Sequence, residues 1–401
     1  MDVEPQAGPG LADRRARAAV AALFFTNGAL FANLIPRYPQ IKDDLGLGNA
    51  AYGLSVAAFP TGAIVAGLAA GVLVRRFGSA RVATAGTFLT GAGALAAGVA
   101  PAVWVFAGAL FLAGAMDAVT DVAQNAHGLR VQRRYRRSII NSFHAIWSIG
   151  AVTGGVMAAA AIAAGLPRGV HLTISAALFA VVALVALRFC LPGPEVEPTP
   201  DATGDPRART GTLGTRTVLV VAALVVIATA GTVVEDAGNS WAALYLADSL
   251  SAPAAVAAWG YIALVGAQFV GRLGGDRLVD RFGQRAVARA GGLVAAAGMG
   301  LALAVPTVPG TILGFAAAGL GVATLVPAAM HEADELPGLK PGTGLTVVSW
   351  LMRLGFLLSP PVVGAVADAS SLRLGLLVVP AAGLLVVVTA GVLSRRASAP
   401  R

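Results

Sequence analysis

The polar residues that could do chemistry are concentrated on one face of a single predicted helix. This face carries two acids and two amides, spaced i, i+4, i+7 and i+8: Asp117, Asp121, Gln124 and Asn125. Side chains at this spacing share one side of an α-helix. Two carboxylates one turn apart repel each other when both are charged, so one of them is suited to carry a proton. The alternative is two acids that a cavity solvates or that hydrogen bonds to other helices hold.

A second polar face follows about one helix later in the chain. Asn141, His144 and Ser148 share one side of the next predicted helix. At ~1.5 Å per residue, His144 and Asp121 differ in depth by only a few Å. We therefore predict a contact between them that would tune both groups. The alternative is a structural histidine that is hydrogen-bonded to a helix backbone.

The second half of the chain offers another set of polar residues. Glu235 and Asn239 are one helical turn apart and Trp241 follows them, which suits the polar and aromatic wall of a binding site. The alternative is an aromatic belt with interfacial acids. Arg353 lies near the middle of an apolar run and stays charged, so it needs either a carboxylate partner or an anionic ligand.

The elements that must position these residues are apolar helices. Hydrophobic residues make up 57% of the chain and charged residues 12%, whereas a soluble domain has about 25% charged residues. Runs of about 20 apolar residues predict membrane-spanning helices. Twelve such runs are present: 18–36, 50–73, 81–100, 103–127, 139–163, 171–191, 217–245, 254–274, 286–305, 308–330, 343–366 and 372–394. The predicted fold is an all-α membrane protein with twelve transmembrane helices.

The basic residues predict the orientation of these helices. With the N-terminus inside, 24 of the 29 Lys and Arg residues fall in cytoplasmic segments, four in outer loops and one within a span. The positive-inside rule then places both termini in the cytoplasm, in the cell inner (plasma) membrane. The net charge of +9 is therefore a topology signal, and no nucleic-acid partner is expected.

A repeated loop indicates that the chain has two similar halves. The segment 73–86 recurs 205 residues later as 278–291, with nine of fourteen aligned positions identical. The repeat predicts two pseudo-symmetric six-helix bundles at 18–191 and 217–394, joined by a cytoplasmic linker at 192–216. Polar cytoplasmic tails are predicted at 1–17 and 395–401. In a membrane, two similar halves are typical of a transporter with its site between them.

The repeated loop resembles the signature of the major facilitator superfamily, roughly G-x-x-x-D-R-x-G-x-R. The second copy, Gly275–Arg285, matches it with one extra residue after the glycine. The resemblance implies a gating loop at Asp280, Arg281, Gly283 and Arg285. The first copy keeps Arg76 and Gly78 but has Arg75 at the acidic position, so it lacks the family's gating acid. The alternative for this copy is a basic turn that serves only topology.

Four segments narrow the resemblance to the branch around the L-fucose:proton symporter and its uncharacterised bacterial relatives. They are 121–127, 141–150, 235–241 and 355–361. The resemblance implies a monomeric, proton-coupled carrier of a sugar-like solute, and Arg353 adds the option that this solute is an anion. The chain departs from the symporter at Ala32, where the symporter has an acid.

Other chemistries lack their motifs. The four His residues and the single Cys are scattered without metal-ligand spacing, and no Walker-type phosphate loop is present, so neither a cofactor nor an enzyme activity is expected. We expect a secondary active transporter whose partners are a small polar solute, protons and the lipid bilayer. One alternative is proton-driven efflux of drugs or metabolites, although segment 150–155 lacks the proline of that subfamily's motif. An alternative from another class is a polytopic receptor or scaffold that transports nothing.

Overall fold

The computed structural model describes residues 10–135, 139–193, 214–336, 339 and 342–394. The first six predicted spans correspond to α1 (Leu11–Ala32), α2 (Tyr38–Asp44), α3 (Asn49–Val56), α4 (Ala58–Phe77), α5 (Ser79–Gly98), α6 (Val103–Tyr135), α7 (Ile140–Ala163) and α8 (Arg168–Leu187). The last six correspond to α9 (Thr215–Leu244), α10 (Ala254–Phe282), α11 (Gln284–Ala304), α12 (Val308–Val322), α13 (Leu325–Asp334), α14 (Thr343–Leu351), α15 (Arg353–Ala369), α16 (Leu372–Gly375) and α17 (Val378–Thr389). Short 3-10 or π turns (Ile35–Arg37, Tyr245–Ser249 and Ala390–Val392) extend three of these helices.

These helices confirm the predicted fold class. Within the described residues, eleven continuous helical stretches are long and apolar enough to cross a membrane. The remaining helix, α5, has 20 residues and lies where the third span is predicted. The longest helix, α6, has 33 residues and would measure about 50 Å, more than the ~30 Å hydrocarbon core, so it carries its Arg-rich end beyond the membrane.

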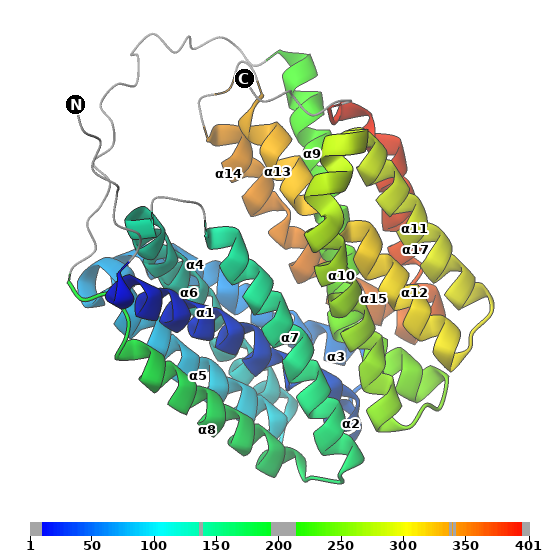
Figure 1. The fold of residues 1–401 in the computed structure, drawn as a ribbon. Coiled ribbons are helices and arrows are strands. Elements are labelled where there is room, and N and C mark those ends of the chain that lie inside the picture. Colours follow the sequence, from blue (N-terminus) through cyan, green and yellow to red (C-terminus); the bar gives the residue numbers. More distant parts are fainter. Residues whose placement is uncertain (1–9, 136–138, 194–213, 337–338, 340–341, 395–401) are drawn as a thin grey trace. The chain divides into compact units, whose positions relative to one another are not determined.

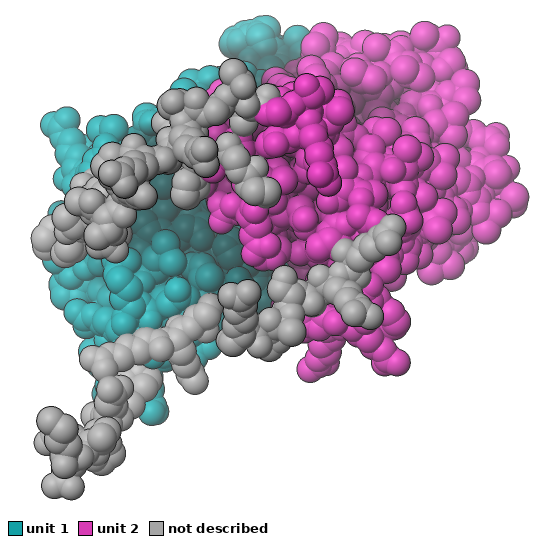
Figure 2. Space-filling view, turned by 90° about the horizontal axis from the view of Figure 1, so that it is seen from above, with its two compact units in different colours: residues 1–37, 58–196 teal, residues 38–57, 197–401 magenta. Residues whose placement is uncertain are grey.

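The chain forms two compact units, coloured separately in Figure 2. One contains residues 1–37 and 58–196, and the other contains residues 38–57 and 197–401. The 38–57 segment, which includes α2 and α3, therefore packs with the second half of the chain, although the sequence places it after the first predicted span and at the start of the second. The domain boundaries drawn from the sequence stay a prediction.

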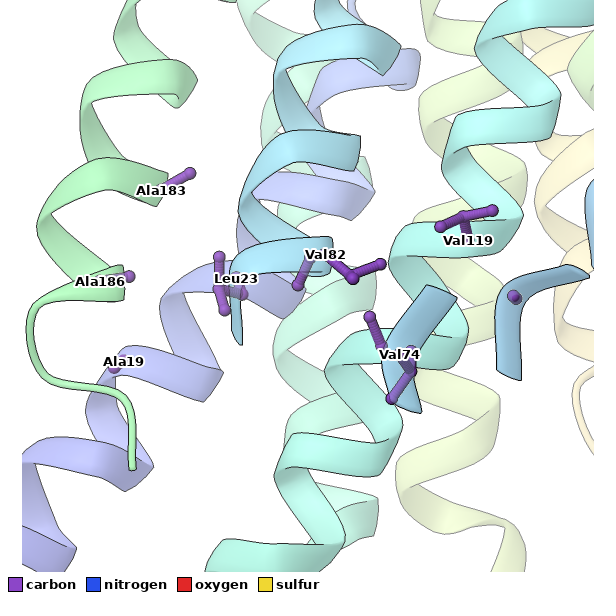
Figure 3. Packing of buried hydrophobic residues seen from close by; sticks show 10 residues of the cluster. Ala19, Leu23, Val74, Val82, Val119, Ala183 and Ala186 are labelled. Atoms are coloured by element: carbon purple, nitrogen blue, oxygen red, sulfur yellow. The ribbon is translucent and has the colours of Figure 1, made fainter. Parts of the chain in front are cut away.

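In the first unit, α1, α5 and α6 each contact four other helices. α6 packs against α4 and α5, while α1 packs against α5, α6, α7 and α8 (Figure 1). A core cluster joins five helices around mostly small side chains, among them Leu23, Val82, Val119, Ala183 and Ala186 (Figure 3). Small residues let membrane helices approach closely, which explains why alanine and valine dominate this core.

In the second unit, α9 takes the central place. It contacts α10, α13, α14, α15 and α17 (Figure 1). α15 also packs along α3 of the 38–57 segment. The first span of each predicted half thus contacts several other helices of its own unit.

Some predicted segments fall partly or wholly outside the described residues. These are residues 1–9 of the predicted N-terminal tail, most of the predicted linker 192–216, and the predicted C-terminal tail 395–401. Helix α1 already begins at Leu11, within the predicted tail of residues 1–17. There Asp13 forms an ion pair with Arg134 of α6, at 3.2 Å.

Candidate functional site

A hydrogen-bonded cluster in the first unit centres on Asn27 of α1. Its side-chain nitrogen donates to Asp117 Oδ1 at 2.7 Å, and its oxygen accepts from Trp147 Nε1 at 2.8 Å. Gln124 Nε2 also approaches this oxygen, at 3.5 Å. One buried amide therefore joins the polar face of α6 to α1 and α7.

Asp121 lies at the other end of the same face. Its Oδ1 accepts hydrogen bonds from Gln124 Nε2 at 3.3 Å and from Asn125 Nδ2 at 3.0 Å. Asp117 is half-buried, whereas Asp121 is exposed. The four predicted residues of α6 are thus brought together, with Asp117 bonded to α1 and Asp121 bonded to amides of its own helix.

The next polar residues belong to α7, the helix that follows α6 in the sequence. Asn141 and His144 are both exposed. The His144 ring stands edge-on to Phe24 of α1, with centroids 5.2 Å apart, and Ser148 Oγ donates to the His144 carbonyl oxygen at 3.2 Å. The contact between Asp121 and His144 stays a prediction.

Close helix packing holds Asn27 against Trp147. A methyl group on Gly28 would overlap the carbonyl oxygen of Trp147, and one on Gly150 would overlap that of Phe25. Only glycine lets α1 and α7 approach this closely, as is common where small residues line membrane helix interfaces. The hydrogen bond between the Asn27 and Trp147 side chains depends on this approach.

In the second unit, Glu235 of α9 pairs with two residues of α10. Gln268 Nε2 donates to Glu235 Oε2 at 2.7 Å, and Arg272 Nη2 lies 3.7 Å from the same oxygen. The carboxylate is partly exposed and compensated by a cation. Glu235 therefore links α9 to α10 through these two side chains.

The other predicted residues of the second half have different surroundings. The side-chain oxygen of Asn239 is buried without a hydrogen-bond partner. Trp241 is fully buried, and its ring stands edge-on to Tyr52 at 5.1 Å, so it belongs to the packed interior of the unit. Arg353 is exposed at the start of α15 and forms no ion pair with any described residue.

The repeated loop takes the same shape twice. Gly78 has φ +84° and Gly283 has φ +81°, a left-handed conformation that favours glycine. In each copy, the preceding arginine (Arg76 or Arg281) lies 5.3 Å from the ring of the phenylalanine that follows it. The sequence repeat therefore encodes the same turn between two helices in both halves.

The acid and the last arginine of the second loop differ in their contacts. Asp280 is exposed and forms no ion pair within the described part of the chain. Arg285 donates to the carbonyl oxygen of Leu393 at 3.0 Å and to that of Gly391. It thereby ties this loop to the end of the last span.

Comparisons with known proteins decide the family. A family model described as Major Facilitator Superfamily matches residues 20–277, which is more than half of the chain. The chain belongs to the major facilitator superfamily. It is 30% identical to an uncharacterised transporter, y4wD, of Sinorhizobium fredii, over 94% of this chain and 97% of the relative. It is 29% identical to the membrane protein MosC of Rhizobium meliloti, over 92% of this chain and 88% of that protein.

Solved structures share the fold of this major facilitator protein. A mutant form of the nucleoside transporter NupG has a TM-score of 0.74 at 13% identity, covering 94% of this chain and all of that one. The D-xylose-proton symporter has a TM-score of 0.66 at 16% identity, covering 94% of this chain and 96% of that one. The protein is thus a multi-pass membrane transporter of this superfamily and not an enzyme.

Within this major facilitator fold, three contact residues were missed by sequence reasoning: Asn27, Gln268 and Arg272. Asn27 and Gln268 are polar residues inside apolar runs, and Arg272 lies at the cytoplasmic end of the run 254–274; polar residues within a span usually face a partner or a wet cavity. That signal could have marked Asn27 as a partner for the acids of α6. The described residues contain no group of three or more His, Cys, Asp or Glu side chains arranged to hold a metal.

Proposed function

We propose that this transporter moves a small polar solute by alternating access and couples the movement to protons through Asp121. It would act as a monomer in the cell inner membrane, with both termini in the cytoplasm. The positive-inside distribution of arginine supports this orientation. The fold shared with a D-xylose-proton symporter and a nucleoside transporter supports a polar solute.

The observation that carries the proposal is that each unit has a buried amide oxygen without a donor. Gln124 Oε1 and Asn239 Oδ1 are both buried and form no hydrogen bond. A buried acceptor that stays unsatisfied costs about 1–3 kcal/mol. A hydroxyl group of a sugar-like solute that reached either oxygen would supply its missing donor, whereas a hydrophobic drug would leave that oxygen unsatisfied.

Neutral sugars should therefore stabilise the purified transporter. A bound ligand at about 100 times its Kd adds ~2.7 kcal/mol of stability, which should raise the unfolding midpoint by a few degrees. Gln124→Leu and Asn239→Leu should each lose most of this shift because neither can accept the solute's hydrogen bonds. The matched control is Thr153→Val. It removes a hydroxyl that donates to the Ile149 carbonyl oxygen of its own helix, so this variant should keep the full stabilisation by sugars.

A thermal-shift screen against neutral sugars, sugar acids and hydrophobic cations makes this measurement. Stabilisation by hydrophobic cations alone would contradict the polar-solute proposal and favour drug efflux. The midpoint of each variant without solute shows whether that variant is folded.

Arg353 supports a second candidate solute, a sugar acid. Its guanidinium is exposed and forms no ion pair with a described residue, so it is available to a carboxylate or phosphate. The planar guanidinium can bind such a group with two parallel hydrogen bonds.

Arg353→Gln should accordingly weaken sugar-acid binding and leave neutral-sugar binding unchanged. Loss of one charged hydrogen bond costs about 1.5–3 kcal/mol, which is about 10- to 100-fold in Kd. The comparison variant is Arg353→Lys, which keeps the charge but not the planar fork, and should lose less. Equal affinity of the wild type and Arg353→Gln for every sugar acid would rule out this role for the arginine.

A further inference from the structure

Asp236 is a buried acid that the proposed transport cycle has not used. It is 6% exposed. Its Oδ1 accepts one hydrogen bond from Ser240 Oγ at 3.1 Å, and its Oδ2 has no hydrogen-bond partner. Among the described residues it forms no ion pair, unlike Glu235 next to it, which has Arg272. This carboxyl group thus lies in the interior of the second unit without a compensating cation.

Aromatic residues of the 38–57 segment cover this acid. Tyr38 and Tyr52 are both fully buried and lie near enough to Asp236 to interact with it electrostatically. The Tyr52 hydroxyl donates to the backbone oxygen of Ser240 at 2.7 Å, one turn from Asp236 on α9. The two tyrosine rings stand edge-on to each other at 5.8 Å. The cover is therefore a packed aromatic layer that keeps water from the carboxyl group.

The 38–57 segment is anchored to the second unit by polar contacts at its surface. Asp368, at the end of α15, accepts hydrogen bonds from the backbone nitrogens of Asn49 at 2.9 Å and Ala50 at 2.8 Å. A carboxylate at these free N–H groups stabilises the start of α3. Lys42 also pairs with Asp248 at 3.2 Å.

The chain continues from α3 directly into the other unit. α3 ends at Val56 and α4 begins at Ala58, which belongs to the first unit. In the predicted orientation the 38–57 segment lies at the outer side of the membrane. The predicted first half, 18–191, includes this segment. If the halves alternate as proposed and the segment moves with the first half, opening of the outer side separates it from α9 and α15 and exposes Asp236 to water.

Burial of an ionised carboxylate without a cation costs several kcal/mol, far more than burial of the neutral acid. The unpartnered Oδ2 could carry the proton. The hydroxyl of Ser359 on α15 is buried beside Asp236, close enough to interact with its carboxyl group. We propose that Asp236 is a second proton-binding site, which takes up a proton from outer water when the 38–57 segment docks and returns that proton to outer water when the segment separates. This inference rests on the proposed alternating access. It adds a step in which protonation of Asp236 accompanies docking of the 38–57 segment.

The other titratable groups around Asp236 agree with this role. Tyr38 of α2 and Tyr52 of α3 face it from the cover, Glu235 precedes it on α9, and Tyr261 of α10 faces Tyr38 and Glu235. None of them is a cation. Glu235 repels a second negative charge on its neighbour, so the pair does not favour an ionised Asp236 in the docked state.

Docking can be measured directly with two spin labels in nanodiscs, without any solute. Suitable label positions are Leu54 on α3 and Leu374 on α16, with 65% and 49% exposure, in a Cys190→Ser background. The measured quantity is the fraction of molecules in which the two labels are at the distance of the docked segment. In the wild type, this fraction should fall by about half or more between about pH 5.5 and about pH 8.5, because an ionised Asp236 opposes docking. Asp236→Asn is neutral at every pH and should stay docked throughout this range. Asp236→Glu should restore the pH dependence.

Glu235→Gln is the matched control, because it removes the adjacent carboxylate that has its own partners. Docking should still depend on pH in this variant, but should be lost at a lower pH because Glu235 no longer repels the charge on Asp236. A docked population that does not change with pH in the wild type, or that changes equally in Asp236→Asn, would overturn the proposal. The spin-label measurement needs no solute. If docking depends on pH but no polar solute stabilises the protein, only the proposed solute is contradicted.

Discussion

Asp121→Asn should abolish uphill accumulation of the solute and leave counterflow largely intact. Asparagine keeps an oxygen that can accept the hydrogen bonds from Gln124 and Asn125, which lie 3.3 and 3.0 Å from Asp121 Oδ1, but it cannot carry a proton. Counterflow exchanges solute for solute and needs no net proton movement. One proton moving through about 100 mV supplies ~2.3 kcal/mol, so accumulation should drop from about 50-fold to none.

Proteoliposomes with an imposed membrane potential and proton gradient provide the measurement. The matched control is Asp117→Asn, one turn away on the same face. Asp117 is held by Asn27 at 2.7 Å, so this variant should bind solute more weakly but still accumulate it against a gradient. Undiminished accumulation by Asp121→Asn would reject the assignment, and Glu235 would become the next candidate for the coupling acid.

Most of the fold could be predicted because the membrane imposes a length and a composition on each span. The predicted run 139–163 is α7 (Ile140–Ala163), and the run 286–305 is α11 (Gln284–Ala304). The two copies of the duplicated loop also share a backbone conformation, with positive φ at Gly78 and Gly283. Hydropathy reports where the membrane lies and not where a helix ends. Helix α1 therefore begins before the first apolar run, at Leu11.

The interior of each unit was harder to predict, because contacts between distant segments decide which polar residue is buried. Glu235 and Asp236 are adjacent in the sequence, yet one pairs with Arg272 and the other lies beneath Tyr52. Helical spacing predicted the shared face of Asp121 and Asn125, since that pattern lies within one helix. It could not predict that Asn27, 90 residues before Asp117, donates to that acid.

Gly150→Ala should destabilise the first unit and weaken solute binding at the same time. A methyl group at this position would overlap the carbonyl oxygen of Phe25, which belongs to a helix backbone and cannot rotate away. Such overpacking typically costs about 1–3 kcal/mol. Separation of α1 from α7 would also lengthen the 2.8 Å hydrogen bond between Trp147 Nε1 and Asn27 Oδ1. Asn27 would then no longer hold Asp117 and Gln124 in place.

Gly67→Ala is the matched control, since a methyl group there meets nothing within 4 Å and Gly67 lies within helix α4. Alanine is about 0.5–1 kcal/mol better than glycine inside a helix, so this variant should be neutral or slightly more stable. The unfolding midpoint and the counterflow rate of both variants should be compared under identical conditions. Trp147→Phe, which removes only the hydrogen bond, should weaken solute binding with a smaller loss of stability. If Gly150→Ala unfolds at the wild-type midpoint and keeps wild-type counterflow, close packing of α1 against α7 does not position the polar cluster.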